Sequence, residues 1–365
     1  MRFLCICKRR PQGRDLLTRP YGRFFHLPYH LAKQGHGVTL LLLSYQPGPV
    51  EHRYQHGFEW YSESLYPIMK NGGILAYIKR AQTLISDYKP DWIIGFSDTW
   101  YGILAQHLGT RYKIKTLIDA YDNYESYIPL AKPLHWVWRR ALRRATAITA
   151  AGPNLGELMA QGRSDNATVV PMAADPMFQP MDRDACRGQM GLPPDAPLVG
   201  YCGSLYRSRG VETLFQVIEI LCRLVPEVKL VLSGRRQKGM EIPSAIRPSV
   251  IECGYLPDEY MPLLLNSMNV LLTINRPSSF GEYSYPVKIY EAMQCDVPIV
   301  ATAVAGTKWI LRNHPECLVS PDDTTSLAKR VEYFLSTERS KKYGIVEEWS
   351  ESAALLIRLM ATVRD

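Results

Sequence analysis

The sequence predicts an α/β protein made of two Rossmann-like, doubly wound domains that face each other across a cleft. Three observations lead to this fold class. At 365 residues the chain exceeds the size of one ordinary hydrophobic core, so two domains are expected. Short apolar runs alternate with segments of helical periodicity, which is typical of parallel strands covered by helices on both faces. A proline-rich stretch divides these runs into two series.

The expected strands are buried runs of about three to six residues, each followed by a turn or a helical segment. In the first series they are Arg2–Cys7, Val38–Leu43, Trp92–Phe96, Lys115–Asp119, Ala147–Ala150 and Thr168–Val170. In the second series they are Leu198–Cys202, Lys229–Ser233, Ser249–Cys253, Val270–Ile274, Pro298–Thr302 and Cys317–Val319.

The domain boundary lies in Pro171–Pro197, a stretch with six prolines and few periodic apolar positions, as expected of a linker. We therefore expect one domain over residues 1–178, a second over 179–345 and a closing segment over 346–365. In the closing segment Trp349, Leu356 and Met360 recur at helical spacing, which predicts an amphipathic helix.

Composition excludes several classes of protein. Hydrophobic residues make up 46% and charged residues 21% of the chain, and no apolar run approaches the roughly 18 residues that span a bilayer. The apolar run near Met1 is too short for a signal-peptide core. The eight cysteines form no C-x-x-C pair, which favours buried, reduced thiols in the cytoplasm over disulfides or a metal site.

The positive charge of the chain is concentrated in its first half. Residues 1–180 contain 22 Lys and Arg against 13 Asp and Glu, whereas residues 181–365 contain 21 against 22. A basic half favours an anionic partner, such as a phosphate-bearing substrate, an acidic membrane surface or nucleic acid. A merely solvated basic face fits the charge equally well.

The loop Gly200–Gly210 joins an expected strand to the expected helix Val211–Leu224. Gly203 permits close backbone approach, the helix start offers free N–H groups, and Arg207 and Arg209 supply cations, which together suit a diphosphate. A tight turn with solvated arginines is the alternative. Neither the P-loop pattern nor G-x-G-x-x-G is present, which disfavours a nicotinamide dinucleotide.

Lys288 and Glu291 follow Pro286 and share one face of the first helical turn. They form either a surface ion pair or part of a ligand site. In the first half, the loop after the first strand contains four arginines that either hold an anionic acceptor or are solvated: Arg9, Arg10, Arg14 and Arg19.

Two acidic residues follow expected strands of the first half. Asp122 either contacts a ligand or caps a helix, and Asp98 with Trp100 is a weaker pair of the same kind. The segment Leu134–Ala145 combines two tryptophans with four arginines. It is either a helix that lies on an anionic membrane or a helix with Trp136 in the core and a solvent-exposed basic face.

Several stretches together resemble the retaining glycosyltransferases of family 4, which have the GT-B fold. They are GYCGSLYRSRGVETL, VVPMAADPMFQP, LVLSGRRQKG, IECGYLPDEYMPLLLNSMNVLLT, YPVKIYEAMQCDVPIVAT and EEWSESAALLIRLM. The resemblance covers nearly the whole chain and is denser in the second half. It implies that the N-terminal domain binds the acceptor, that the C-terminal domain binds a nucleotide sugar, and that the last helix crosses back to the N-terminal domain.

The resemblance also implies residue roles. Glu291 accepts hydrogen bonds from the donor ribose, Arg209 neutralises the diphosphate, and the backbone at Gly254 and Tyr255 reads the nucleobase. The remaining implied donor contacts are Gly22, Gly203, Ser204, Arg207, Tyr283, Ser284, Tyr285 and Lys288. The implied catalytic residues are Asp122, Arg209, Lys288 and Glu282. Ser204 stands where the family often has arginine, and Tyr283 where it has glutamate, so Glu282 is expected to substitute.

The implied activity is that of a metal-independent, retaining hexosyltransferase without a cofactor. It moves a hexose or N-acetylhexosamine from a UDP or GDP sugar to a saccharide or lipid-linked acceptor, in polysaccharide or glycolipid synthesis. We expect a cytoplasmic protein, at the inner face of the membrane, with peripheral membrane contact through its basic domain and without nucleic acid. The alternatives are a nucleotide-sugar 2-epimerase of similar fold and a non-catalytic basic binding protein.

Overall fold

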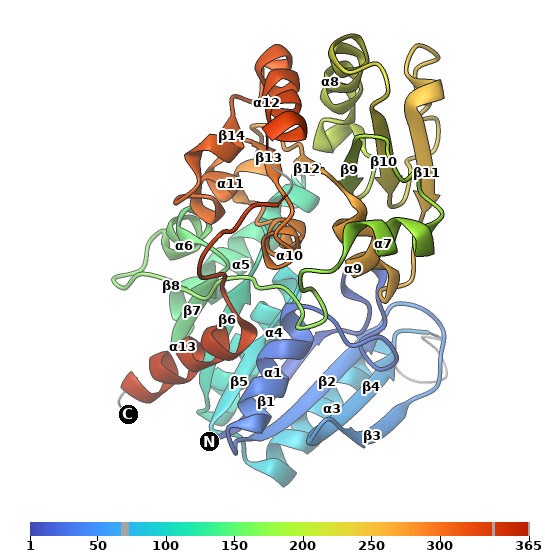
Figure 1. Cartoon of the computed structure of the whole chain (residues 1–365). Helices are drawn as coiled ribbons and strands as arrows, with labels where there is room; N and C mark the ends of the chain where they lie inside the picture. Colours follow the sequence, from blue (N-terminus) through green and yellow to red (C-terminus); the bar gives the residue numbers. More distant parts are fainter. Residues whose placement is uncertain (67–72, 338–339, 364–365) are drawn as a thin grey trace. The chain divides into compact units, whose positions relative to one another are not determined.

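The computed structural model describes residues 1–66, 73–337 and 340–363 and divides the chain into two compact units. Unit 1 comprises Met1–Ala173 together with Glu347–Asp365, and unit 2 comprises Ala174–Val346. The division therefore falls between Ala173 and Ala174, a few residues before the expected boundary. Each unit is built around its own mainly parallel sheet (Figure 1).

The sheet of unit 1 has the order β3-β4-β2-β1-β5-β6-β7-β8. Its strands are β1 (Arg2–Lys8), β2 (Gly37–Ser44), β3 (Glu51–Gln55), β4 (Phe58–Ser64), β5 (Trp92–Gly95), β6 (Lys115–Ala120), β7 (Ala147–Ala150) and β8 (Thr168–Val169). All pairs are parallel except β3 with β4. The strand order reverses between β1 and β5, which is where open α/β sheets bind ligands.

The hairpin β3–β4 is absent from the expected strands. Its outer strand β3 is largely exposed and carries charged and polar side chains, so it lacks the apolar run that marks a buried strand. The turn at His56 and Gly57, both with positive φ, joins it to β4. Apolar periodicity detects core strands, whereas this edge strand is specified by its turn and by pairing with β4.

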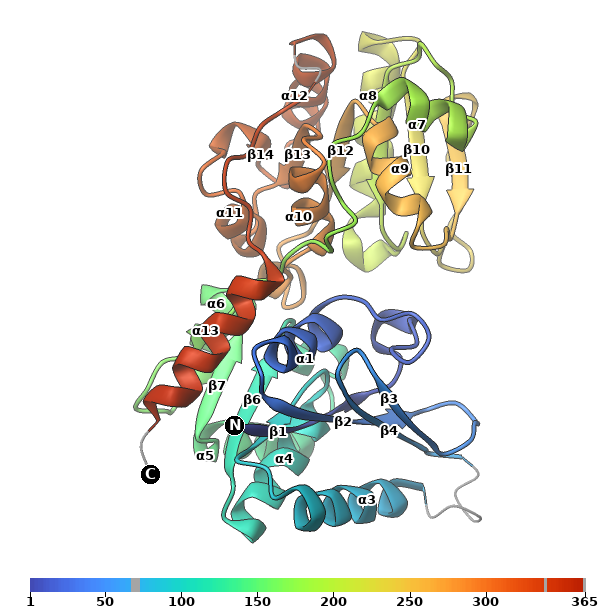
Figure 2. The same cartoon turned by 60° about the horizontal axis from the view of Figure 1, so that its bottom comes forward.

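Helices cover both faces of the unit 1 sheet. They are α1 (Arg23–Lys33), α3 (Gly73–Tyr88), α4 (Thr99–Tyr112), α5 (Lys132–Arg144), α6 (Pro153–Ala160) and α13 (Trp349–Thr362). Figure 2 shows α1 on one side of the sheet and α3 and α4 on the other. The C-terminal helix α13 packs on α1, where Trp349 stacks on His26 and the Ser352 hydroxyl donates to the Pro171 carbonyl. The last helix thus belongs to unit 1.

The sheet of unit 2 has the order β11-β10-β9-β12-β13-β14 and is parallel throughout. Its strands are β9 (Leu198–Cys202), β10 (Lys229–Ser233), β11 (Val250–Gly254), β12 (Val270–Thr273), β13 (Ile299–Thr302) and β14 (Leu318–Val319). Strands β9, β10 and β11 advance in one direction, and β12 returns to the other side of β9. The strand order therefore reverses between β9 and β12.

The helices of unit 2 lie in two layers. They are α7 (Arg183–Met190), α8 (Val211–Leu224), α9 (Tyr260–Ser267), α10 (Val287–Gln294), α11 (Ala305–Ile310) and α12 (Thr324–Thr337). Helices α8 and α12 pack together on one face of the sheet, and α7, α9 and α10 lie on the other (Figure 2).

Helix α7 corrects the expectation that Pro171–Pro197 is a linker throughout. Asp182 caps this helix by accepting from the Ala185 amide, and Gly191 ends it in the left-handed conformation. Arg187 is buried and donates to the Ser267 carbonyl and the Asn269 side chain. The helix is short and mostly polar, so its sequence lacks a long apolar stripe.

Candidate functional site

Two loops of unit 2 meet where the strand order of its sheet reverses. One loop follows β9 and the other follows β12. Gly210 caps α8 at φ 82°, and a Cβ added there would lie 2.9 Å from the Cγ of Arg276. This close approach requires glycine, and it places the exposed Arg276 beside the start of α8. The sequence analysis did not single out Arg276.

Glycines connect the turns after the three strands β9, β10 and β11. The Gly203 amide donates to the Ser233 carbonyl at 2.9 Å, and the Gly234 amide donates to the Gly254 carbonyl at 2.9 Å. A Cβ on Gly234 would lie 2.1 Å from the Gly203 carbonyl oxygen. The turns that contain Gly203 and Gly254 are therefore adjacent at the carboxyl edge of the sheet. Gly234 holds them together and was missed as a site residue.

Arginines line the loop after β9. Arg209 is half-buried, and its guanidinium lies 5.3 Å from the centre of the Phe280 ring. Burial raises the pKa of Tyr201, and the positive charge of Arg209 opposes that shift, which places Arg209 near the end of β9. Arg207 is exposed and its Nε lies 3.7 Å from Glu212, while Ser204 is half-buried and adds no charge.

Lys288 and Glu291 form a buried ion pair at the start of α10. The Lys288 Nζ lies 2.6 Å from a Glu291 carboxylate oxygen, and the Glu291 side chain is 0% exposed. Burial raises the pKa of Cys202 to about 12. The positive charge of Lys288 lowers this pKa, and the negative charge of Glu291 raises it. The charges of the pair therefore act on the last residue of β9, directly before the Gly203 loop. Of the two sequence interpretations, the solvated surface pair is wrong.

The segment before α10 packs closely against α11. The Glu282 carboxylate accepts from the Ala305 amide at 2.8 Å, so it caps α11. A Cβ on Gly306 would lie 2.0 Å from the Ser284 carbonyl oxygen, and the buried Tyr285 ring lies 5.8 Å from the ring of Trp309. Tyr283 is half-buried. The structure thus gives the Glu282 carboxylate a helix-capping role within unit 2.

The turn after β11 presents an exposed aromatic ring. Gly254 adopts φ 65°, and the following Tyr255 is 47% exposed. The Arg235 guanidinium, from the turn after β10, lies 4.9 Å from the centre of the Tyr255 ring. The backbone of this turn and the flat Tyr255 ring are therefore both accessible to a ligand at this end of the sheet.

Unit 1 has a polar cluster at its own reversal of strand order, between β1 and β5. The Lys8 Nζ lies 3.3 Å from the Asp98 carboxylate. The Tyr45 hydroxyl, at the end of β2, accepts from the Trp100 indole at 2.8 Å and lies 3.5 Å from Asp98. Sequence analysis singled out Asp98 and missed its contacts with Lys8 and Tyr45, which come from the ends of β1 and β2.

Asp122 follows β6 and is buried at 8% exposure. Its carboxylate accepts from the Tyr127 hydroxyl at 2.5 Å. Burial, followed by the charge of Asp122, raises the pKa of Tyr127 strongly, so this hydroxyl stays protonated and keeps donating. Asn123, and not Asp122, accepts from the Glu125 amide at the next short helix.

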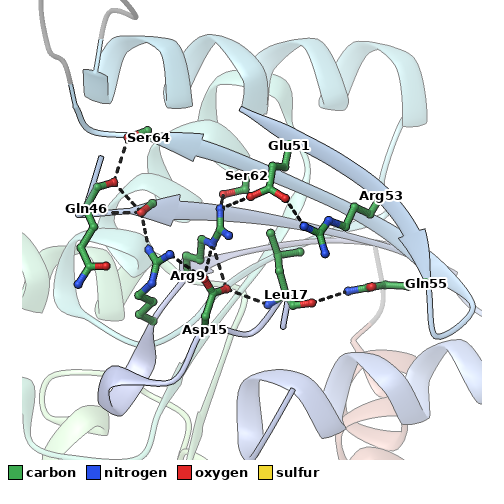
Figure 3. Close-up of polar contacts among 11 residues, drawn as sticks. Arg9, Asp15, Leu17, Gln46, Glu51, Arg53, Gln55, Ser62 and Ser64 are labelled. Carbon is green, nitrogen blue, oxygen red and sulfur yellow. Dashed lines mark hydrogen bonds and ion pairs between the residues drawn. The ribbon is translucent and has the colours of Figure 1, made fainter. Parts of the chain in front are cut away.

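Figure 3 shows that Arg9 is enclosed by acidic and hydroxyl side chains. Its guanidinium lies 2.9 Å from Asp15 and 2.7 Å from Glu51 and donates to the Ser62 hydroxyl at 3.1 Å. Arg10 lies 2.6 Å from the same Asp15. The expectation that these two arginines hold an anionic acceptor is not favoured, because their charges are balanced inside unit 1.

The other two arginines of this loop are half-buried. The Arg14 guanidinium lies 3.6 Å from the centre of the Tyr21 ring, and the Arg19 amide donates to the Asp15 carbonyl. Gly22, at φ 66°, caps α1. The neighbouring Arg23 is fully engaged in the core, where it binds both carboxylate oxygens of Asp119.

Residues 1–66, 73–337 and 340–363 contain no group of three or more His, Cys, Asp or Glu side chains placed to hold a metal ion. Within the same ranges, every helix is too short or too polar to cross a bilayer.

The chain matches two family descriptions. "Glycosyl transferase 4-like domain" matches residues 23–173, and "Glycosyl transferases group 1" matches residues 196–337. Together the two matches span most of the chain, one in each structural unit.

Curated relatives resemble the chain over part of their length. A D-inositol 3-phosphate glycosyltransferase of Stackebrandtia nassauensis is 28% identical over 46% of this chain and 40% of the relative. The alpha-D-kanosaminyltransferase of Streptomyces kanamyceticus is 26% identical over 62% of this chain and 59% of the relative. The matched region thus spans about half the length of these relatives.

Solved structures show the same fold over the whole chain. Sucrose-phosphate synthase of Thermosynechococcus elongatus has a TM-score of 0.78 at 18% identity, covering 99% of this chain and 98% of that one. Anabaena HepE in complex with UDP and glucose has a TM-score of 0.75 at 16% identity, covering 99% and 100%. The two family descriptions match the two units in sequence, and the two α/β units together have the GT-B fold. The chain therefore belongs to the group 1, family 4-like glycosyltransferases.

Proposed function

We propose that the protein is a metal-independent, retaining glycosyltransferase. It moves a hexose or N-acetylhexosamine from a nucleoside-diphosphate sugar to a hydroxyl of a saccharide or lipid-linked acceptor, in the cytoplasm. One observation supports the proposal. In unit 2, the charges of Arg209 and of the Lys288–Glu291 pair act on Tyr201 and Cys202, the last two residues of β9, directly before the Gly203 loop and where the strand order reverses.

The chemistry that this site offers is electrostatic. As the bond between sugar and diphosphate breaks, Arg209, Lys288 and the amino end of α10 stabilise the charge that builds on the leaving group. The leaving phosphate takes the proton of the acceptor hydroxyl, so the reaction needs no strong protein base. Glu291 accepts from the ribose hydroxyls once Lys288 has turned from it toward the phosphate.

HepE is described in complex with UDP-glucose, and its fold is similar. We therefore propose UDP as the donor nucleotide to test first. On unit 1, we propose that Asp98, Tyr45 and Trp100 contact the acceptor, because an aromatic ring beside a carboxylate suits a sugar ring and its hydroxyls.

The binding test follows the melting temperature of the full chain with UDP, GDP and ADP. A ligand at a hundred times its Kd stabilises the folded protein by about 2.7 kcal/mol, so one nucleotide should raise the melting temperature clearly. Glu291→Ala and Arg209→Gln should lose this response. Arg223→Gln, which removes an exposed arginine of α8, is the matched control. Absence of any response in the unchanged protein would refute the proposal.

The stereochemical test uses the nucleotide sugar that passes the binding test. NMR of the product in the presence of EDTA should show the anomeric configuration of the donor. An inverted product, or activity that EDTA abolishes, would contradict retention or metal independence respectively. Formation of a 2-epimer without acceptor would instead identify an epimerase.

A further inference from the structure

One face of unit 1 carries basic and aromatic side chains. Helices α4 and α5 and the loop before α5 form it. The sequence has no Asp or Glu between Asp98 and Asp119, a stretch that contains α4. It has none between Glu125 and Glu157 either, a stretch that contains α5. The positive charges of this face are therefore not balanced by acids of the same helices.

Large apolar side chains are exposed on the same face. Leu130 is 90% exposed, Trp136 is 61% exposed and Ile128 is 54% exposed. Isolated exposed apolar residues are common on soluble proteins, but a tryptophan and two aliphatic residues within nine positions form a patch. Ile128 and Leu130 lie in the loop directly before α5, and Trp136 lies within α5.

The basic residues of α5 are aligned with this patch. Lys132, Trp136, Arg140 and Arg144 recur every four residues, so they follow one side of the helix. The Arg140 guanidinium lies 5.8 Å from the centre of the Trp136 ring. The opposite side is buried, with Trp138 at 4% exposure. One side of α5 packs against the rest of unit 1, and the other side, which is basic and aromatic, is exposed to solvent.

A groove of about 470 Å³ runs between α4 and α5. Arg111 of α4 and Arg140 and Arg144 of α5 line it together with the apolar Ile103 and Val137. Three guanidinium-bearing side chains from two helices therefore share this groove with apolar and uncharged polar side chains. This combination suits an anionic head group attached to a hydrocarbon chain.

We propose that this face binds the surface of an anionic lipid bilayer. We define it by Arg111, Ile128, Leu130, Trp136, Arg140 and Arg144. The tryptophan and the aliphatic side chains enter the interfacial layer, where the amphipathic indole is favoured. The arginines pair with lipid phosphates, and the groove holds a head group. Nucleic acid fits less well, because exposed aliphatic side chains gain little on a phosphate backbone.

The test is sedimentation of the full chain, without nucleotide, with vesicles of two compositions. We expect binding to phosphatidylcholine mixed with phosphatidylglycerol, weak binding to phosphatidylcholine alone, and release by salt. Each arginine near such a surface contributes roughly fivefold, so Arg140→Gln/Arg144→Gln should weaken binding about thirtyfold. Trp136→Ala, an exposed position, should weaken it without changing the melting temperature.

The matched control is Arg223→Gln/Lys329→Gln, which removes two exposed charges from α8 and α12 of unit 2. It should bind vesicles as the unchanged protein does. Equal binding by the face variants and the control would overturn the proposal, as would retention of DNA in a mobility shift without vesicle binding. The readout needs no donor or acceptor, so it stands independently of the transferase assay.

Discussion

The Lys288 ammonium lies 2.6 Å from the Glu291 carboxylate, which is fully buried. Removing Lys288 takes a close counter-charge from a fully buried carboxylate, and breaking a buried pair costs about 3–5 kcal/mol. We therefore expect Lys288→Met to lower the free energy of unfolding by that order in urea titrations. The double change Lys288→Met/Glu291→Met should recover much of the loss.

Lys308→Met is the matched control, because Lys308 is an exposed lysine on the next helix, α11. It should change stability by less than about 0.5 kcal/mol. A Lys288 variant as stable as this control would show that Glu291 has another counter-ion. The stability test uses no nucleotide and so separates the pair's structural role from its proposed role in donor binding.

Gly234 provides the second prediction. A Cβ there would lie 2.1 Å from the Gly203 carbonyl oxygen, so Gly234→Ala must push the turns after β9 and β10 apart. We expect a loss of roughly 2 kcal/mol or more in stability and a weaker melting response to nucleotide. Gly239→Ala is the control, because Gly239 also has positive φ but nothing lies within 4 Å of its added Cβ. If the two variants lose equal stability, backbone strain and not the contact explains the effect.

Glu282 tests the helix-capping role against a role in catalysis. Its carboxylate accepts from the Ala305 amide at the start of α11, and a glutamine carbonyl can accept the same hydrogen bond. Glu282→Gln should therefore keep its stability and its donor turnover, whereas Glu282→Ala should lose about 0.5–2 kcal/mol. A Glu282→Gln variant with normal melting and strongly reduced turnover would restore the catalytic assignment.

Apart from β4, the sequence predicted the parallel strands of both sheets within one or two residues, because most of them are short apolar runs. Strand β3 was missed because it is an exposed edge strand without apolar residues at alternate positions. Strand β4 was missed because its buried second half is polar, with Ser62, Glu63 and Ser64. Helix α7 was missed because it is short and mostly polar and is defined by its caps.

In the site, the spacing of Lys288 and Glu291 showed that they share a face, but it could not show burial. Burial depends on residues that are distant in sequence, such as Phe178, whose ring centre lies 5.7 Å from the Lys288 ammonium. The sequence likewise could not show that Glu282 caps α11 or that Gly234 contacts Gly203, because both contacts depend on how loops from different strands meet in space.

The last prediction concerns Arg9 and acid. Burial alone raises the pKa of Glu51, but hydrogen bonds from Arg9 and Arg53 outweigh it, so the pKa falls below its usual value of 4.5. A carboxylate with a lowered folded-state pKa contributes stability above its unfolded pKa and loses it as pH falls through the folded value. Arg9→Met removes the main partner of Glu51 and Asp15, so we expect a loss of about 3 kcal/mol at neutral pH. This difference from the unchanged protein should shrink below pH 4.5. Urea unfolding across a pH series measures it, with Lys79→Met, an exposed change in the same unit, as control. A difference that is constant with pH would mean that Arg9 stabilises unit 1 by packing and not through its carboxylate partners.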